Sequence, residues 1–268
     1  MNVNESKYNL KNDGFCFLPK IFSNVVIQKS RQGLWRVING NYESGHQPEN
    51  RFWNPGDDPH SIIKIDKPHL CDQSIWDLIT NKTFGKLLAK ATKADSIQVW
   101  HSQVVWKPRS KNEKGNAGWH RDSQYWPFWS KEGLYTAWIA LSDVTARSGP
   151  VRFICGSNHW NDIKGMDFFN QNIMSQEKTL KKTKKNQKIV SAMLKMGEAS
   201  IHSSTTYHSS LGNKEKEPRI GMVVHFRTEK AQIMKTEGNE ENYLDQIKDP
   251  AIAPIIYKKK IEPRKKIF

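Results

Sequence analysis

The sequence predicts a mainly β protein with helices in its first third, built as a β-barrel or a β-sandwich. After about residue 95, short alternating or apolar runs recur between turn signals. Before that point, longer segments carry apolar residues at helical spacing. Many short strands after helices are typical of a barrel or sandwich with helical support. The length of 268 residues suits one such domain, so we expect a single domain over residues 1–268.

The composition is compatible with a folded core and gives no sign of a membrane protein. Hydrophobic residues make up only 37%, but ten tryptophans and eleven phenylalanines supply large apolar side chains. No apolar run reaches the length of a membrane span, and the polar start lacks a signal-peptide pattern. Three widely spaced cysteines argue against a disulfide framework or a zinc knuckle. We therefore expect a cytoplasmic protein with no membrane partner.

The formal net charge of +15 comes mostly from lysine and is concentrated in residues 178–188 and 258–266. One interpretation is a nucleic-acid or membrane surface, and the other is a solvated, lysine-rich exterior. Neither run contains interleaved aromatic residues of the kind that stack on bases. We favour the solvated exterior and expect no nucleic-acid partner, although the positive field would attract a small anion. The sequence carries no signal for an oligomeric state.

The first elements follow from local signals. Asp13–Gly14 predicts a turn, and a short strand follows it until Pro19. Ser23 is a suitable N-cap for a helix whose apolar positions continue to Ile38.

A long irregular segment comes next, because residues 39–59 are rich in Gly, Asn, Pro and Asp. Loops of this length are usually functional or disordered. Residues 61–65 predict a short strand. Residues 74–94 have a helical pattern with a weak point near Gly85.

The segment 97–107 alternates strictly and predicts a strand with two distinct faces. One face carries His101, Gln103 and Lys107 beside valines and isoleucine, and the other carries tryptophans. Such a mixed polar face either lines an interior cavity or is an ordinary exposed face.

The second half of the chain predicts four further strands, at residues 134–142, 151–154, 197–204 and 219–227. The polar, basic segment 158–188 between them predicts a helical insertion or a mobile flap. Residues 189–196 predict a strand or a short helix.

His120 and Asp122 have the spacing of two metal ligands on one side of a strand end. With a second imidazole, they would form the two-histidine, one-carboxylate face that non-haem Fe(II) oxygenases use. A His-x-Asp pair is a weak signal by itself, because chance matches are common.

His202 and His208 are both placed to supply the missing imidazole, on or just after a late strand. Eleven residues after His208, Arg219 opens the next strand, where its guanidinium could bind a carboxylate in a bidentate manner. This arrangement favours His208 as the ligand and His202 as a packing or supporting residue.

Several short motifs occur together, in this order: Asp13–Gly14–Phe15, Trp119–His120–Arg121–Asp122, Ser148–Gly149–Pro150, Gly156–Ser157, Tyr207–His208–Ser209–Ser210 and Pro218–Arg219–Ile220–Gly221. In order and spacing, from about residue 8 to 228, they resemble the phytanoyl-CoA dioxygenase family of Fe(II)/2-oxoglutarate oxygenases. That family includes ectoine hydroxylase and phosphonate hydroxylases. Residues 229–268 match no motif of the family and form a C-terminal extension.

The resemblance implies a double-stranded β-helix, or jelly-roll, supported by N-terminal helices. It implies that His120, Asp122 and His208 hold Fe(II) and act in catalysis. Arg219 would bind the distal carboxylate of the co-substrate 2-oxoglutarate, with Ser210 beside it. O₂ would be the second co-substrate, with ascorbate in a supporting role.

The resemblance also assigns residues around this centre. Lys64, Gln103 and Trp138 fall at positions that contact the co-substrate or the active site. Lys107 matches a lysine that contacts the co-substrate in the ectoine hydroxylase branch, and Trp126 matches a tryptophan of the cavity in that branch.

The function implied is hydroxylation of a small organic metabolite with release of succinate and CO₂, and the basic charge of the chain favours an anionic metabolite. We expect Gln103, His101, Trp126 and Gln124 to line the substrate pocket, with segments 39–59 and 158–188 as its lids. The alternative is a non-catalytic jelly-roll that binds a small anion or nucleic acid through its basic surface.

Overall fold

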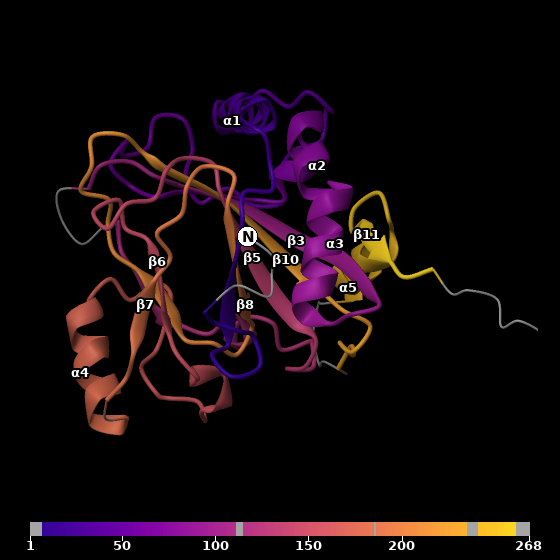
Figure 1. The fold of residues 1–268 in the computed structure, drawn as a ribbon. Helices are drawn as coiled ribbons and strands as arrows, with labels where there is room; N and C mark the ends of the chain where they lie inside the picture. Colours follow the sequence, from indigo (N-terminus) through magenta and orange to yellow (C-terminus); the bar gives the residue numbers. More distant parts are fainter. Residues whose placement is uncertain (1–6, 111–114, 185, 235–240, 261–268) are drawn as a thin grey trace, which may run out of the picture.

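The computed structural model describes residues 7–110, 115–184, 186–234 and 241–260. These residues form two antiparallel sheets, five α-helices, short 3₁₀ helices and connecting loops. In the large sheet the strand order is β1-β8-β5-β10-β3-β11, and β2 also pairs with β3. In the small sheet the order is β4-β9-β6-β7. Figure 1 shows α2 and α3 on one side of the large sheet and β6, β7 and α4 on the other.

The strands of the large sheet are β1 (Phe15–Leu18), β2 (Ile63–Asp66), β3 (Ser96–Lys107), β5 (Leu134–Ala140), β8 (Ala199–Ser203), β10 (Arg219–Arg227) and β11 (Ile255–Lys258). Those of the small sheet are β4 (Ala117–His120), β6 (Val151–Ile154), β7 (Ile189–Ser191) and β9 (His208–Ser210). The helices are α1 (Asn24–Ile38), α2 (Gln73–Ile79), α3 (Lys82–Thr92), α4 (Ile173–Thr183) and α5 (Glu241–Lys248). The prediction of a mainly β fold with helices at its front is confirmed.

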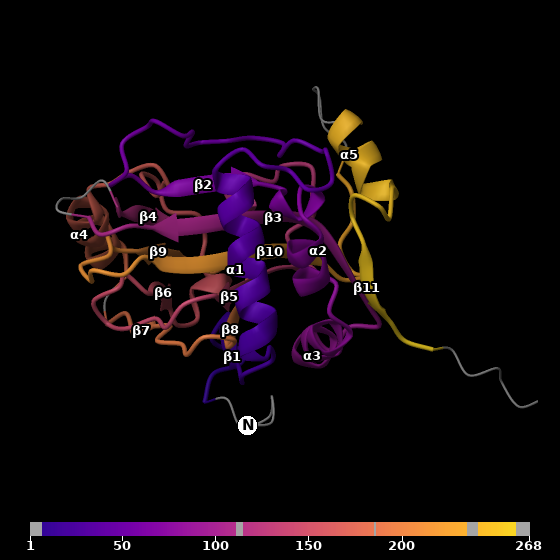
Figure 2. The ribbon, with the colours of Figure 1, turned by 90° about the horizontal axis from the view of Figure 1, so that it is seen from above.

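The outer face of the large sheet is apolar and lies under the first three helices. Ile139, Met222 and Val224 on this face are fully buried in one hydrophobic cluster. Leu34 of α1 and Leu78 of α2 belong to the same cluster. Figure 2 shows α1 crossing over the strands that it covers. This face holds most of the hydrophobic core and anchors the sheet.

The inner face of the same strands is polar, because alternate residues of a strand point to opposite sides. In β10, Arg219 lies opposite Lys107 of β3. Further along, His225 lies opposite His101 on one side and Thr136 on the other. The polar face that alternation predicted for β3 therefore faces the interior between the two sheets.

One predicted helix is in fact two. The pattern over residues 74–94 divides into α2 and α3, and the break lies at Asn81 instead of Gly85. The side chain of Asn81 accepts hydrogen bonds from the backbone N–H groups of Thr83 and Phe84, and so begins the second helix. Gly85 continues α3, where a Cβ would lie 2.5 Å from the carbonyl oxygen of Ile256 in β11.

Other local predictions have clear outcomes. Ser23 caps α1 as expected, accepting from the N–H of Val26. In the described part of the predicted insertion 158–188, a 3₁₀ helix ends at His159, α4 follows later, and the rest is turns and irregular backbone. The lysine-rich run 258–266 ends outside the described residues. None of the helices in the described part of the chain is long and apolar enough to cross a membrane.

Candidate metal centre and adjoining cavities

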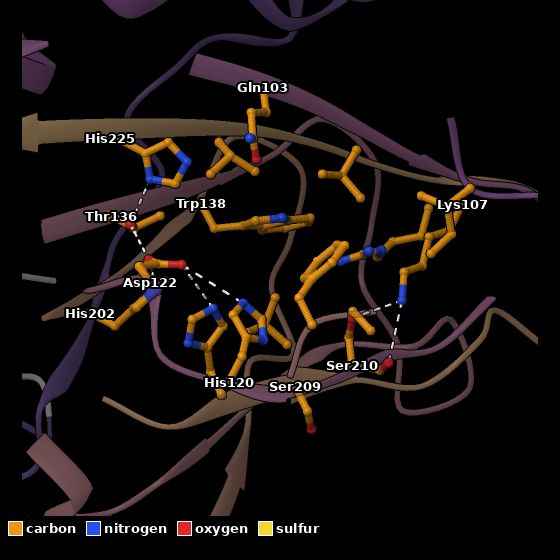
Figure 3. A pocket seen from close by; sticks show the side chains of 18 residues that line it. Gln103, Lys107, His120, Asp122, Thr136, Trp138, His202, Ser209, Ser210 and His225 are labelled. Atoms are coloured by element: carbon orange, nitrogen blue, oxygen red, sulfur yellow. Dashed lines mark hydrogen bonds and ion pairs between the residues drawn. The ribbon is translucent and has the colours of Figure 1, made fainter. Parts of the chain in front are cut away.

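The three predicted metal ligands, His120, Asp122 and His208, lie close together between the two sheets. His120 ends β4, Asp122 follows it, and His208 begins β9, which places the two imidazoles opposite each other in the small sheet. The ligand atoms of these three buried residues all lie within 4.8 Å of one another. Figure 3 shows the side chains of His120 and Asp122 directed toward each other.

Both imidazoles are held with Nε2 free to bind a metal. Nδ1 of His120 lies 2.7 Å from the carbonyl oxygen of Gly118, and Nδ1 of His208 lies 3.0 Å from that of Thr206. A carbonyl only accepts, so each Nδ1 carries the proton and each Nε2 has a free lone pair. Burial lowers the pKa of His120 and holds that of His208 well below its usual range, so both rings are neutral near pH 7.

The carboxylate of Asp122 is oriented by two donors. Its Oδ2 accepts from the hydroxyl of Thr136 at 2.5 Å and from Nε2 of His202 at 3.0 Å. Oδ1 faces the ligand imidazoles, 3.8 Å from Nε2 of His120 and 3.5 Å from Nε2 of His208. Burial alone would raise the pKa of Asp122, but His208 and His202 lower it well below its usual range. Two neutral imidazoles and one ionised carboxylate on one face suit Fe(II), so this triad could hold iron.

His202 lies next to this triad and serves a different purpose. Since the ionised carboxylate of Asp122 can only accept, Nε2 of His202 must donate its proton to it and has no lone pair for a metal. Its Nδ1 has no hydrogen-bond partner among the described residues. The geometry matches the expectation that His202 supports the centre.

Two buried cations lie together beside the triad. Arg219 and Lys107 are each 1% exposed, and neither has an acidic partner among the described residues. Nε and Nη1 of Arg219 have no hydrogen-bond partner there, and burial lowers its pKa to about 9. Nζ of Lys107 donates to the hydroxyl of Ser210 at 2.7 Å and to the carbonyl of Leu211 at 2.9 Å. Burial first, and then Arg219, holds the pKa of Lys107 well below its usual range.

An unpaired buried guanidinium is costly to fold, so this pair of cations indicates a site for an anionic ligand. Trp138 forms one wall of the site, with its ring 4.9 Å from the guanidinium carbon of Arg219. The indole lies against Gly221, where a Cβ would come within 2.0 Å of a ring carbon. Gly221 is therefore required for Trp138 to lie at this place.

A family comparison and structural comparisons agree with this geometry. The family model described as phytanoyl-CoA dioxygenase matches residues 10–221, which is most of the chain. The chain belongs to the phytanoyl-CoA dioxygenase family. It is thus an enzyme of the Fe/2-oxoglutarate-dependent non-haem oxygenase superfamily, which favours the enzyme hypothesis over the non-catalytic alternative. No individual curated protein sequence matches the chain.

Solved structures of related enzymes share the fold. EctD from S. alaskensis, with 2-oxoglutarate and 5-hydroxyectoine, has a TM-score of 0.66 at 17% identity, over 90% of this chain and 86% of that one. The epimerase SnoN from nogalamycin biosynthesis, with Fe³⁺, α-ketoglutarate and nogalamycin RO, has a TM-score of 0.64 at 18% identity, covering 85% and 84%. The carbocyclase SnoK has a TM-score of 0.64 at 16% identity, covering 88% and 87%. The predicted jelly-roll fold of the family is confirmed.

Two cavities adjoin the triad of His120, Asp122 and His208, and they share Gln103, His120, Asp122, Phe168 and His225. The first cavity extends toward the buried cations and is also lined by Lys107, Trp138, Ser210 and Arg219. The second extends in another direction and is also lined by Lys64, Tyr125, Trp126 and Phe169. Figure 3 shows the first cavity with Lys107 and Ser210 at one end and Asp122 at the other.

The structure thus separates residues that the resemblance assigned together. Lys64 lies in the second cavity with Trp126, whereas Arg219 lies in the first. The ammonium group of Lys64 lies 4.2 Å from the ring centre of Phe52 and 5.3 Å from that of Phe168. Gln103 contributes to both cavities.

Two residues expected at the substrate pocket line neither cavity. His101 is stacked behind His225, with ring centres 5.5 Å apart, so His225 takes the position at the cavity wall. Gln124 closes a local turn instead: its side chain accepts from the N–H of Arg121 and donates to the carbonyl of Met166. No residue of segment 39–59 lines either cavity, although Phe52 contacts Lys64.

Thr136, His225 and Phe168 are site residues that the sequence reasoning missed. The signal for His225 was present, because it lies on the same face of β10 as Arg219, six residues further on. Thr136 likewise shares a face of β5 with Trp138. Phe168 comes from the irregular segment 158–188, where no periodicity could place it.

Proposed function

We propose that the protein is an Fe(II)- and 2-oxoglutarate-dependent oxygenase that hydroxylates a small, anionic organic metabolite and releases succinate and CO₂. The observation that carries this proposal is the pairing of two features in one cavity. Arg219 and Lys107 are buried cations without acidic partners, and they lie beside a triad suited to iron. A dicarboxylate such as 2-oxoglutarate would satisfy both features at once.

His120, Asp122 and His208 are the residues that would hold the iron. When bound, iron supplies the activation of O₂ that no side chain can provide. The residues contribute two neutral Nε2 lone pairs and one carboxylate oxygen, all from one side, so the opposite side stays open for co-substrates. Thr136 and His202 keep the second oxygen of Asp122 occupied.

The proposed role of Arg219 is to bind the distal carboxylate of 2-oxoglutarate. Nε and Nη1 of Arg219 have no partner among the described residues, and the guanidinium can donate two parallel hydrogen bonds to one carboxylate, either from Nε and Nη2 or from Nη1 and Nη2. Lys107, held by Ser210, adds a second positive charge, and Trp138 limits the space between them and the metal triad. These contacts orient the co-substrate and keep water away from it.

The second cavity is the proposed substrate pocket. The ammonium group of Lys64 in this cavity has aromatic neighbours and no ion pair among the described residues. This favours an anionic substrate. Trp126 and Phe168 supply apolar walls. Segment 158–188 is the proposed lid, because Phe168 and Phe169 extend from it into the wall of this cavity.

Succinate formation tests the proposal. Purified protein is supplied with Fe(II), 2-oxoglutarate, O₂ and a panel of carboxylates, phosphonates and acyl thioesters. We expect succinate and a product one oxygen heavier than its substrate, and we expect neither with His120→Ala or Asp122→Ala. His46→Ala, an exposed histidine away from the triad, is the matched control.

Three outcomes would contradict parts of the proposal. Succinate no higher than in the triad variants would contradict the oxygenase activity. A product without added oxygen would contradict hydroxylation. Turnover of 2-oxoglutarate that no anionic compound stimulates would contradict the anionic substrate.

A further inference from the structure

A short chain of hydrogen bonds leads from the metal ligand Asp122 to His225. The hydroxyl of Thr136 lies 2.5 Å from Oδ2 of Asp122 and 2.8 Å from Nδ1 of His225. A threonine hydroxyl has one proton, and an ionised carboxylate has none to give. The hydroxyl proton therefore points to Asp122, and Nδ1 of His225 must donate to the hydroxyl oxygen.

This arrangement leaves Nε2 of His225 as a hydrogen-bond acceptor. Burial lowers the pKa of His225 to about 3, so the ring is neutral and only Nδ1 carries a proton. Among the described residues, Nε2 has no hydrogen-bond partner. His225 lines both cavities, and Figure 3 shows its second ring nitrogen directed away from Thr136.

The ring cannot easily turn to hide this atom. Trp126 packs edge-on against it with ring centres 4.8 Å apart, and His101 stacks on it at 5.5 Å. The ring centre of Trp100 lies 5.8 Å from that of His225. The imidazole is thus fixed, with one lone pair presented to the space beside the metal triad.

We infer that the substrate carries an O–H or N–H group that donates a hydrogen bond to Nε2 of His225. The word substrate here rests on the proposed function, and the inference narrows its class. Besides its negative charge, the substrate then has a hydroxyl, amine or amide donor close to the metal triad and an apolar or aromatic part that packs against Trp126 and Phe168. An analogue that has only an ether or a carbonyl at this point would place one acceptor against another, the lone pair of Nε2. It would therefore bind more weakly.

The tautomer of His225 is the first test, and it needs neither metal nor substrate. In protein labelled with ¹⁵N-histidine, the spectrum of His225→Gln identifies the signals of this ring by their loss. We expect a protonated Nδ1 and a bare Nε2 in the native protein. Thr136→Val removes the acceptor for Nδ1–H and should shift the equilibrium toward the other tautomer. A protonated Nε2 in the native protein would overturn the inference.

A pair of matched probes gives the second test. Benzyl alcohol has an aromatic ring and a hydroxyl donor, whereas benzyl methyl ether has the ring without the donor. We expect benzyl alcohol to move the Nε2 signal of His225 and to bind roughly 3- to 10-fold more tightly than the ether, the usual range for one neutral hydrogen bond. Equal binding of the two probes, or an Nε2 signal that neither probe moves, would count decisively against an acceptor site.

Variants separate hydrogen bonding from shape. His225→Phe keeps a ring but removes the acceptor and should abolish the preference for benzyl alcohol. His225→Gln offers a carbonyl oxygen and should restore part of it, while near-ultraviolet circular dichroism checks that both variants fold. If His225→Phe keeps the full preference, the inference fails.

Failure of this inference differs from failure of the proposed function. If Nε2 of His225 is unprotonated but the protein does not turn over 2-oxoglutarate, the acceptor site is supported and the oxygenase activity is contradicted. The protein could instead turn over a substrate that has no O–H or N–H group, with the same KM in His225→Phe. That result would support the oxygenase activity and contradict the proposed role of His225.

Discussion

The two faces of the large sheet have opposite characters although they belong to the same strands. In β10, Met222 and Val224 point outward into the core beneath the helices, while Arg219 and His225 point inward to the metal triad. A buried aliphatic side chain on the outer face contributes about 1.5–3 kcal/mol of stability. The inner face buries the guanidinium of Arg219 and the imidazole of His225, and burial disfavours the charged form of each, so this face stabilises the fold much less.

The comparison indicates that the outer face of each strand stabilises the fold, whereas the inner face positions the residues of the candidate site. The outer face holds the strands in register, and this register aligns inner residues of β3, β5 and β10. We therefore expect inner substitutions to alter ligand binding with little loss of stability, and outer substitutions to do the reverse.

The largest effect is expected from Asp122→Ala on the inner face. Loss of one of three ligands should weaken divalent metal binding by roughly 100- to 1,000-fold and eliminate turnover. Titration calorimetry with Fe(II) under anaerobic conditions measures the affinity. Undiminished metal binding would show that the triad is not the metal centre.

Arg219→Met should separate binding from stability most clearly. Removing the guanidinium should weaken 2-oxoglutarate binding by about 2–5 kcal/mol, which is the usual cost for a buried charge pair. The same change removes an unpaired buried charge and should stabilise the fold by about 1 kcal/mol or more. Urea unfolding measures the second effect. If Arg219→Met is less stable than the native protein, the expectation that inner-face substitutions cost little stability is wrong.

Met222→Ala tests the outer face at a neighbouring position of the same strand. A cavity in the core should lower the free energy of unfolding by about 2–5 kcal/mol. At a temperature where the variant is folded, its affinity for 2-oxoglutarate should stay within about twofold of the native value, since distant sites are nearly additive. A large loss of affinity would mean that the two faces are coupled.

Thr136→Val is expected to have a smaller effect on the inner face. It removes one donor to Oδ2 of Asp122 but keeps the shape of the side chain. Loss of such a supporting contact typically weakens metal binding by about 10- to 100-fold. Thr145→Val, outside both cavities, is the matched control.

The smallest effect concerns acid sensitivity. Burial lowers the pKa of His69 and His225 to about 3, whereas an unfolded histidine titrates near 6.5. Between these values the unfolded chain binds more protons, so stability is complete above about pH 6.5 and declines as the pH falls. Each histidine should contribute about 1.4 kcal/mol per pH unit to this slope.

Urea unfolding of metal-free protein at several pH values measures the slope. His69→Leu should reduce it by that amount, while an unchanged slope would mean that His69 is already protonated in the folded state. His69 lies outside both cavities. The change in the pH dependence of stability caused by His69→Leu can therefore be compared directly with the change caused by His225→Leu on the inner face.

Much of the site could be predicted because its signals are local. His120 and Asp122 are two residues apart, and Arg219 opens a strand, so spacing and alternation were enough to propose them. The same rule leads from Arg219 to His225, which lies six residues further along on the same face of β10. His101 was placed at the pocket by alternation alone, which cannot tell which of two stacked rings reaches the cavity.

Alternation and turn signals were enough to predict β1, β2, β3, β5, β6, β8 and β10 and the mixed polar face of β3, and the motifs were enough to suggest the family, whereas the short strands β4, β9 and β11 were not predicted. Only the tertiary structure decided which hydrogen-bond partner each histidine has. Those partners leave Nε2 of His120 and His208 free for a metal, make His202 a donor to Asp122, and leave Nε2 of His225 as the acceptor that we propose. The physical reason is that an imidazole has two nitrogens and one movable proton, and the proton's place depends on neighbours that are far away in the chain.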